Sequence, residues 1–251
     1  MTRPYLTLTR RELTSYFVSW TGYAIIAGAA FLMGLSFVVL LDKLRQQPSP
    51  TPVTELFYAT PFFWLILLPA APVITMRLFA LEKFSGTFET LMTTPVSEVQ
   101  VVLAKFTAAL VFYLVMWLPL LACIFTLRYF SNDPVALDPG AIAGTFLGLL
   151  LLGCLFLSLG CFASALTRSQ IVAAMISFAG VIGLFLASFL LDRAELNTGW
   201  LAQAFYCVAL VDHMQDFAHG VVDTRPVVFY LSFTAFFLFL TFRVVESRRW
   251  K

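Results

Sequence analysis

The chain has 251 residues, of which 60 % are apolar and 12 % are charged, whereas soluble domains average about 45–50 % and about 25 %. So much apolar surface excludes a disordered chain, and with only four cysteines it also excludes a secreted domain built on disulfides. The net charge of +2 is too small to indicate nucleic acid as a partner.

The charged residues are bunched and leave seven stretches of 16 or more residues without Asp, Glu, Lys or Arg. A helix that crosses a bilayer needs about 20 apolar residues. The pattern therefore predicts an all-α polytopic membrane protein, in which one transmembrane domain over residues 1–251 contains six transmembrane helices. We expect these spans at 21–41, 59–76, 104–127, 142–166, 170–191 and 226–243, with no charged side chain inside a span.

An amphipathic pattern precedes the first span. Leu6, Leu13, Phe17 and Trp20 recur at helical spacing, and Arg10, Arg11 and Glu12 fall in the same stretch. The pattern predicts an interfacial helix on the membrane surface. The alternative is that these residues are the frayed beginning of the first span.

A long loop, 77–103, joins the second and third spans. Glu82 and Lys83 precede a break at 85–87, after which a short helix is expected until Pro95. Ser97 and Gln100 have the spacing of a capping box, which starts the next helix. These features predict a rigid element that a soluble partner could bind. The alternative is an ordinary connector, although connectors are usually about 4–6 residues long.

The fourth span carries Gly144 and Gly148 at GxxxG spacing, which lets another helix approach closely. That neighbour is either a helix of the same chain, which we favour, or a second copy.

The shortest charge-free stretch, 196–211, is interpreted as part of an outer segment, 192–225, that does not cross the membrane. With six spans, 11 of the 16 Lys and Arg residues lie on the side of the termini. The positive-inside rule then places both termini of this multi-pass protein in the cytoplasm, with the chain in the cell (inner) membrane.

In the outer segment, Asp212, His213, Asp216 and His219 could form a metal cluster or be the hydrated side of an interfacial helix. We expect no metal.

Several kinds of chemistry are missing from the sequence. The charge-free stretches hold no relay residue of the kind that ion-coupled transporters use. No GxxxxGK[ST] loop occurs, and neither does a His-Glu-x-x-His or a Gly-x-Ser-x-Gly motif. We therefore expect a chain that is not an enzyme and binds no cofactor. If ATP drives it, another chain must hydrolyse the ATP.

Four blocks carry a resemblance to a known family. They are Arg10-Arg11-Glu12-Leu13, then Met76-Arg77-Leu78 with Glu82-Lys83, Gly86-Thr87, Glu89 and Pro95-Val96, then Ser164-Ala165-Leu166-Thr167 with Gln170, and His213 with Phe217 and Gly220-Val221-Val222-Asp223. With these blocks the chain resembles the six-helix permease subunits of type 2 ABC (ATP-binding-cassette) exporters, most closely the gliding-motility-type branch.

The resemblance implies an N-terminal interfacial helix, a coupling helix seated on an ATPase subunit, and short outer-face helices between the fifth and sixth spans. It implies three protein partners: a cytoplasmic ABC ATPase that holds ATP and Mg, a second copy of the chain, and a membrane-anchored companion with an extracytoplasmic domain. The residues expected to contact the ATPase are Glu82, Lys83, Gly86, Thr87, Glu89, Leu91 and Pro95. The implied function is export of an unidentified substrate; the alternative is a non-transporting scaffold or force-transmitting subunit of an ABC-type complex.

Overall fold

The structure, a computed structural model, describes residues 2–46, 53–58, 60–87, 97–130, 138–193 and 209–247. All regular elements in these ranges are helices, which confirms the predicted all-α fold. The elements are α1 (Thr2–Val18), α2 (Trp20–Gln46), α3 (Val53–Tyr58), α4 (Pro61–Thr75), α5 (Ala80–Ser85), α7 (Glu98–Met116), α8 (Leu118–Phe130), α9 (Pro139–Leu166), α10 (Gln170–Arg193), α12 (Leu210–Ala218) and α13 (Thr224–Ser247).

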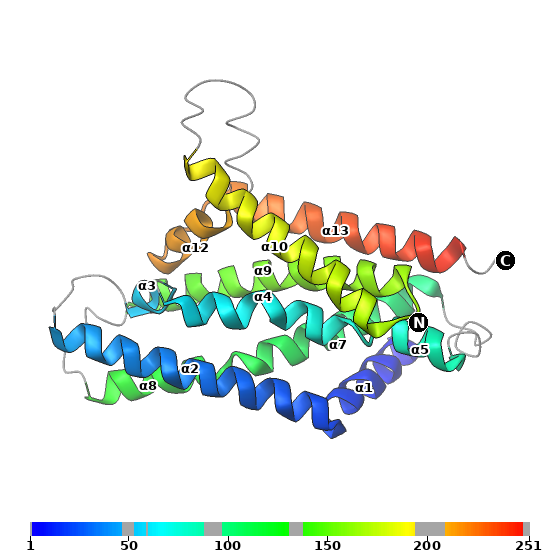
Figure 1. The fold of residues 1–251 in the computed structure, drawn as a ribbon, viewed down its shortest axis with the longest axis horizontal. Coiled ribbons are helices and arrows are strands. Elements are labelled where there is room, and N and C mark those ends of the chain that lie inside the picture. Colours follow the sequence, from blue (N-terminus) through cyan, green and yellow to red (C-terminus); the bar gives the residue numbers. More distant parts are fainter. Residues whose placement is uncertain are drawn as a thin grey trace.

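Six helical stretches of the described chain are long and apolar enough to cross a membrane, as predicted. They are Trp20–Arg45, Pro61–Ser85, Glu98–Tyr129, Pro139–Leu166, Gln170–Ser188 and Thr224–Ser247. Of these stretches the fourth, formed by α9, is the most buried inside the chain, and Figure 1 shows α9 in the middle of the bundle. Of the other spans, those formed by α4, α7, α10 and α13 pack against α9, whereas α2 packs mainly against α4.

The third candidate span is interrupted at Trp117, where α7 ends and α8 begins. Pro119 follows within the first turn of α8 and has no N–H group to continue the hydrogen-bond ladder of α7. The Trp117 N–H instead donates to Leu114 and Val115 carbonyl oxygens. The span thus consists of two helices in series, which the charge pattern alone did not indicate.

The N-terminal segment forms a helix of its own. α1 ends at Val18 and α2 begins at Trp20, so the interpretation of α1 as the frayed start of the first span is wrong. Phe17 packs edge-on against Phe112 of α7, with ring centroids 5.5 Å apart. Leu6 and Trp20, the two ends of the predicted apolar face, are 61 % and 89 % exposed. α1 therefore packs on α7 while both of these side chains stay available to the surroundings.

The two glycines of the GxxxG motif contact α12 of the same chain. A Cβ atom on Gly144 would lie 2.2 Å from the backbone oxygen of Phe217, and one on Gly148 would lie 2.9 Å from Met214 Sδ. Backbones can come this close only where no side chain intervenes. The neighbour predicted for this motif is thus a helix of the same chain.

The two ends of the bundle differ. α1, α5 and the end of α13 lie at one end, and α3 and α12 lie at the other (Figure 1). The first and last described helices thus reach the same end as α5, in agreement with an even number of spans. The residues expected to act together, around α1 and the loop after α4, also gather there.

Replacing Gly144 by alanine should loosen the contact between α9 and α12. We expect Gly144→Ala to lower the free energy of unfolding by about 1–3 kcal/mol, because overpacking a tight contact forces the backbone apart. The matched control is Gly28→Ala on α2, where a Cβ would have no atom within 4 Å. It should be neutral or stabilising by about 0.5–1 kcal/mol. Denaturation of both proteins in detergent, followed by tryptophan fluorescence, measures the difference; equal effects would contradict the assigned contact.

Candidate functional site

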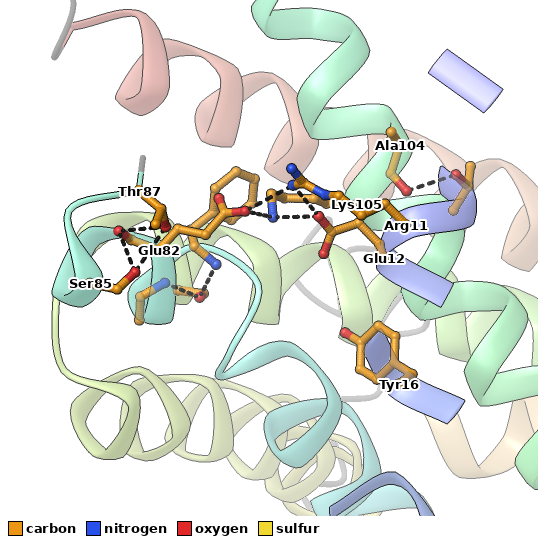
Figure 2. A network of polar contacts seen from close by, with 12 residues as sticks. Arg11, Glu12, Tyr16, Glu82, Ser85, Thr87, Ala104 and Lys105 are labelled. Carbon is orange, nitrogen blue, oxygen red and sulfur yellow. Dashed lines mark hydrogen bonds and ion pairs between the residues drawn. The ribbon is translucent and has the colours of Figure 1, made fainter. Parts of the chain in front are cut away.

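Four charged side chains from three helices meet at the end of the bundle that carries α5 (Figure 2). We name Arg11, Glu12, Glu82 and Lys105 the charged cluster; they come from α1, α5 and α7. The Lys105 ammonium lies 3.2 Å from Glu12 Oε1 and 2.8 Å from Glu82 Oε1. Arg11 Nη2 lies 2.7 Å from the same Glu12 oxygen and 3.2 Å from the same Glu82 oxygen. Two positive and two negative groups thus balance one another.

Lys105 is the most buried member of the cluster. Its side chain is only 2 % exposed, against 13 % for Glu12 and 17 % for Glu82. Its ammonium also lies 5.5 Å from the centre of the Phe79 ring. A buried ammonium is stable only when paired charges and hydrogen bonds replace the water it has lost. Lys105 therefore requires both carboxylates to remain where they are.

This arrangement corrects one expectation from the sequence. Lys105 lies inside the candidate span Glu98–Tyr129, so that span does contain a charged side chain. The sequence does mark this side chain, because Lys105 is the single charged residue between Glu98 and Arg128. What the sequence does not contain is the position of its partners, since Glu12 is 93 residues away along the chain.

Arg11 forms the exposed edge of the cluster, with 53 % of its side chain accessible. Its hydrogen bond to Glu12 raises the pKa of Arg11, and the negative charges of Glu12 and Glu82 add to the effect. The guanidinium thus stays positive over any working pH. Because exposed ion pairs contribute only about 0–1 kcal/mol, Arg11 contributes less to the cluster than Lys105 does.

The segment between α4 and α5 is fastened to the end of α9 by one serine. Ser164 Oγ accepts hydrogen bonds from the N–H groups of Phe79 and Ala80, each at 3.1 Å. The same hydroxyl donates to the Met76 carbonyl oxygen at 3.3 Å. These backbone groups would otherwise lack partners in the interior, which costs free energy. Ser164 therefore sets the position at which α5 begins.

Lys83 points into the protein. It is 9 % exposed, and its ammonium donates to the carbonyl oxygen of Ala165 at the end of α9. Its predicted contact with an ATPase remains a prediction, and the bond seen here is an internal one. Ser164 and Lys83 thus attach α5 and the segment before it to α9 through two different side chains.

The end of α5 is exposed. Gly86 closes the helix with a φ of 74°, the left-handed conformation that glycine adopts without strain. Ser85 and Thr87 are exposed, and their hydroxyls are 2.8 Å apart. Beside them Phe84 is 78 % exposed, a residue that the sequence analysis did not select. The predicted break at 85–87 is confirmed, and it presents a large aromatic side chain with two hydroxyls.

The remaining predicted site residues divide into two groups. Arg10 lies on α1 and is exposed. Glu89, Leu91 and Pro95, like the short helix expected around them, lie outside the described residues. Beyond them the predicted capping box is confirmed: Ser97 Oγ accepts from the Gln100 N–H, and Gln100 Oε1 accepts from the Ser97 N–H, both at 3.4 Å.

Two further side chains join the beginning of the chain to the end of α4 and the loop that follows it. Tyr16 donates its hydroxyl to the Ile74 carbonyl oxygen at 2.9 Å, and burial raises the pKa of Tyr16, which keeps it a neutral donor. Arg77 donates to Ser19 Oγ at 3.3 Å and to Thr21 Oγ1. Ser19 is the residue between α1 and α2, and Thr21 lies in the first turn of α2, so Arg77 fixes this junction against the loop.

The acidic and histidine residues near α12 do not gather as a metal site. Within the described ranges, no three His, Cys, Asp or Glu side chains are placed to hold a metal ion. His213 is 8 % exposed, and its Nδ1 lies 3.3 Å from the Tyr230 hydroxyl of α13. This histidine thus belongs to the packing between α12 and α13.

A comparison with known families identifies the chain. Residues 36–241 match the ABC-2 family transporter proteins. The chain belongs to that family. A comparison with curated proteins gave no match. As an ABC-2 permease, the chain is a multi-pass, non-catalytic membrane subunit of an ABC transporter, and the family partners such a subunit with an ABC ATPase.

The charged cluster of the ABC-2 permease can be tested by deleting its buried charge. We expect Lys105→Met to lower the free energy of unfolding by about 3 kcal/mol, because it leaves two neighbouring carboxylates with one exposed partner. Arg11→Gln should cost at most about 1 kcal/mol. Adding Glu82→Gln to Lys105→Met should recover part of the loss. Chemical denaturation of wild type, these three variants and Glu82→Gln alone measures this; losses of the two single variants that add up in the double variant would contradict the pairing.

Proposed function

We propose that this ABC-2 permease is the membrane subunit of an exporter. Two copies pair and each binds one cytoplasmic ATPase, which holds ATP and Mg, through the loop at 77–103. Closure of the ATPases on ATP then moves the helices of the permease. In this proposal the end of the bundle with α1, α5 and the termini faces the cytoplasm, and the chain lies in the cell (inner) membrane, as the distribution of Lys and Arg favours.

The charged cluster carries this proposal. It joins α5, which adjoins the ATPase in this account, to α1 and α7 through Lys105. The bonds of Ser164 and Lys83 join the same segment to α9, the central helix of the bundle. A displacement applied at α5 therefore reaches three other helices through bonded contacts rather than through a flexible loop. A permease that is moved by ATP hydrolysis in another subunit requires such a connection.

The exposed end of α5 supplies the contact surface. Phe84 offers an aromatic anchor of the kind enriched in protein interfaces, and Ser85 and Thr87 offer hydroxyl groups beside it. The left-handed Gly86 turns the chain at this point. We assign Glu89, Leu91 and Pro95 to the same contact on the basis of the sequence, and Arg10, Arg11 and Glu12 to its border.

Within the family we place the chain nearest the gliding-motility-type branch, on the residues around Glu82 and Gly86. That branch implies a membrane-anchored companion with an extracytoplasmic domain. Such a companion would contact the opposite end of the bundle, where α3 and α12 lie (Figure 1). In this proposal the two conformations of the complex differ at the interface between the two copies, and movement of α5 shifts the equilibrium between them.

Changes at the end of α5 should uncouple the ATPase without removing the permease. Gly86→Pro fixes φ near −65°, which the observed 74° excludes. Glu89→Arg reverses a charge in the proposed contact. We expect each variant to abolish the part of ATP hydrolysis that depends on the permease, with normal amounts in the membrane. Hydrolysis by the purified complex in vesicles measures this.

The matched control is Gly86→Asn, because asparagine tolerates the left-handed conformation and should keep most of the coupled hydrolysis. Unchanged coupling in both Gly86→Pro and Glu89→Arg would overturn the assignment of this loop. In the same vesicles, ATP-dependent movement of fluorescent amphipathic probes would support export. Coupled hydrolysis without movement of any probe would instead favour the scaffold.

A further inference from the structure

A cleft of about 610 Å³ lies beside the charged cluster. Its walls come from α1, the start of α2, the end of α4, α5 and α7. Besides the cluster it is lined by the hydroxyls of Ser15, Ser19 and Thr21, by the apolar side chains of Ile25 and Val73, and by Arg77. The cleft therefore combines a polar wall with an apolar one.

The charges that line the cleft do not balance. The four groups of the charged cluster are neutral as a set, so Arg77 is left as an extra positive charge. It donates to Ser19 and Thr21, which are uncharged. None of the ion pairs among the described side chains involves Arg77. A half-buried guanidinium is better stabilised by an anion than by hydroxyls alone. Among the described residues that line the cleft, positive charges thus outnumber negative charges by one, and an anion would balance the excess.

The position of the cleft points to the source of such an anion. Ser19 directly precedes the candidate span Trp20–Arg45, and Arg77 follows Thr75, the last residue of α4, by two residues, although the second candidate stretch runs on to Ser85. We place both residues near the boundary of the hydrocarbon. Trp20, next to Ser19, is 89 % exposed, and tryptophan is enriched at this depth of a membrane. Ile25 and Val73 lie farther along the two spans from that boundary. An occupant with an anionic head and an apolar tail would match both walls.

We propose that this cleft binds an anionic phospholipid. Arg77, Ser19 and Thr21 hold the headgroup phosphate, and Ile25 and Val73 line the beginning of an acyl chain. The guanidinium matches phosphate geometry with two parallel donors. The hydroxyls of Ser19 and Thr21 are hydrogen-bonded to each other, which leaves one of them to donate to the phosphate. The bound lipid joins the junction of α1 and α2 to the loop that precedes α5. The site itself rests on the contacts of Arg77 and does not depend on transport.

The test measures lipid binding to the full-length permease in detergent by native mass spectrometry, with phosphatidylglycerol, phosphatidylcholine and inorganic phosphate as probes. We expect wild type to bind phosphatidylglycerol more tightly than phosphatidylcholine. Arg77→Gln should weaken phosphatidylglycerol binding about tenfold, which corresponds to one charge-assisted contact. The matched control is Arg168→Gln, an exposed arginine in the turn between α9 and α10, which should bind as wild type does.

A second variant keeps the charge and fills the space. Ser15 is exposed on α1 and lines the cleft, so Ser15→Trp should also weaken phosphatidylglycerol binding while leaving Arg77 in place. Excess inorganic phosphate should leave phosphatidylglycerol bound, because it cannot replace the acyl contacts. The proposal is overturned if both variants bind phosphatidylglycerol like Arg168→Gln, if phosphatidylcholine binds equally well, or if inorganic phosphate displaces the lipid and so shows a free anion to be the occupant.

Discussion

The ammonium of Lys105 is an almost fully buried charge, and the surrounding architecture follows from how it is stabilised. Only 2 % of its side chain is exposed, and both carboxylates within ion-pair distance belong to other helices. If either carboxylate moved away, a buried charge would lose its partner, at a cost of several kcal/mol. α1, α5 and the start of α7 can therefore move together at little cost but can separate only with difficulty.

This constraint explains how a membrane protein of this composition can respond to a soluble partner. The family pairs such a subunit with an ABC ATPase, and the proposed function places the contact with that ATPase at α5 and the loop after it. α5 is the segment that is both exposed, at Phe84, and bonded inward, at Glu82 and Lys83. Ser164 completes the connection to α9, which packs against α12 at the opposite end through Gly144 and Gly148. A continuous set of contacts thus runs from one end of the bundle to the other.

Much of this architecture could be predicted from the sequence, for physical reasons that differ between elements. The number of spans follows from where charge is absent, because hydrocarbon excludes it. The capping box at Ser97 and the break at Gly86 are local patterns that hydrogen bonds and backbone conformation determine. The charged cluster could not be predicted as a unit, because its members are distant in the sequence and only packing brings them together. α1 was predicted as an interfacial helix, and its sequence did not show that Phe17 would pack against Phe112 of α7 while Leu6 stays exposed.

The central claim is that α1 and α5 move as one body when ATP binds, and the distance between them tests it most directly. Spin labels at Leu6 and Ser85, both exposed, can be introduced into a complex whose four native cysteines are replaced, with labelled copies diluted among unlabelled ones. Pulsed electron resonance then gives that distance without nucleotide and with trapped ATP. The account predicts an unchanged, narrow distribution in this sample. In a second, undiluted sample labelled at Ser85 alone, it predicts that the distance between the two copies changes. A shift or broadening of the distance between Leu6 and Ser85 on ATP binding would contradict it.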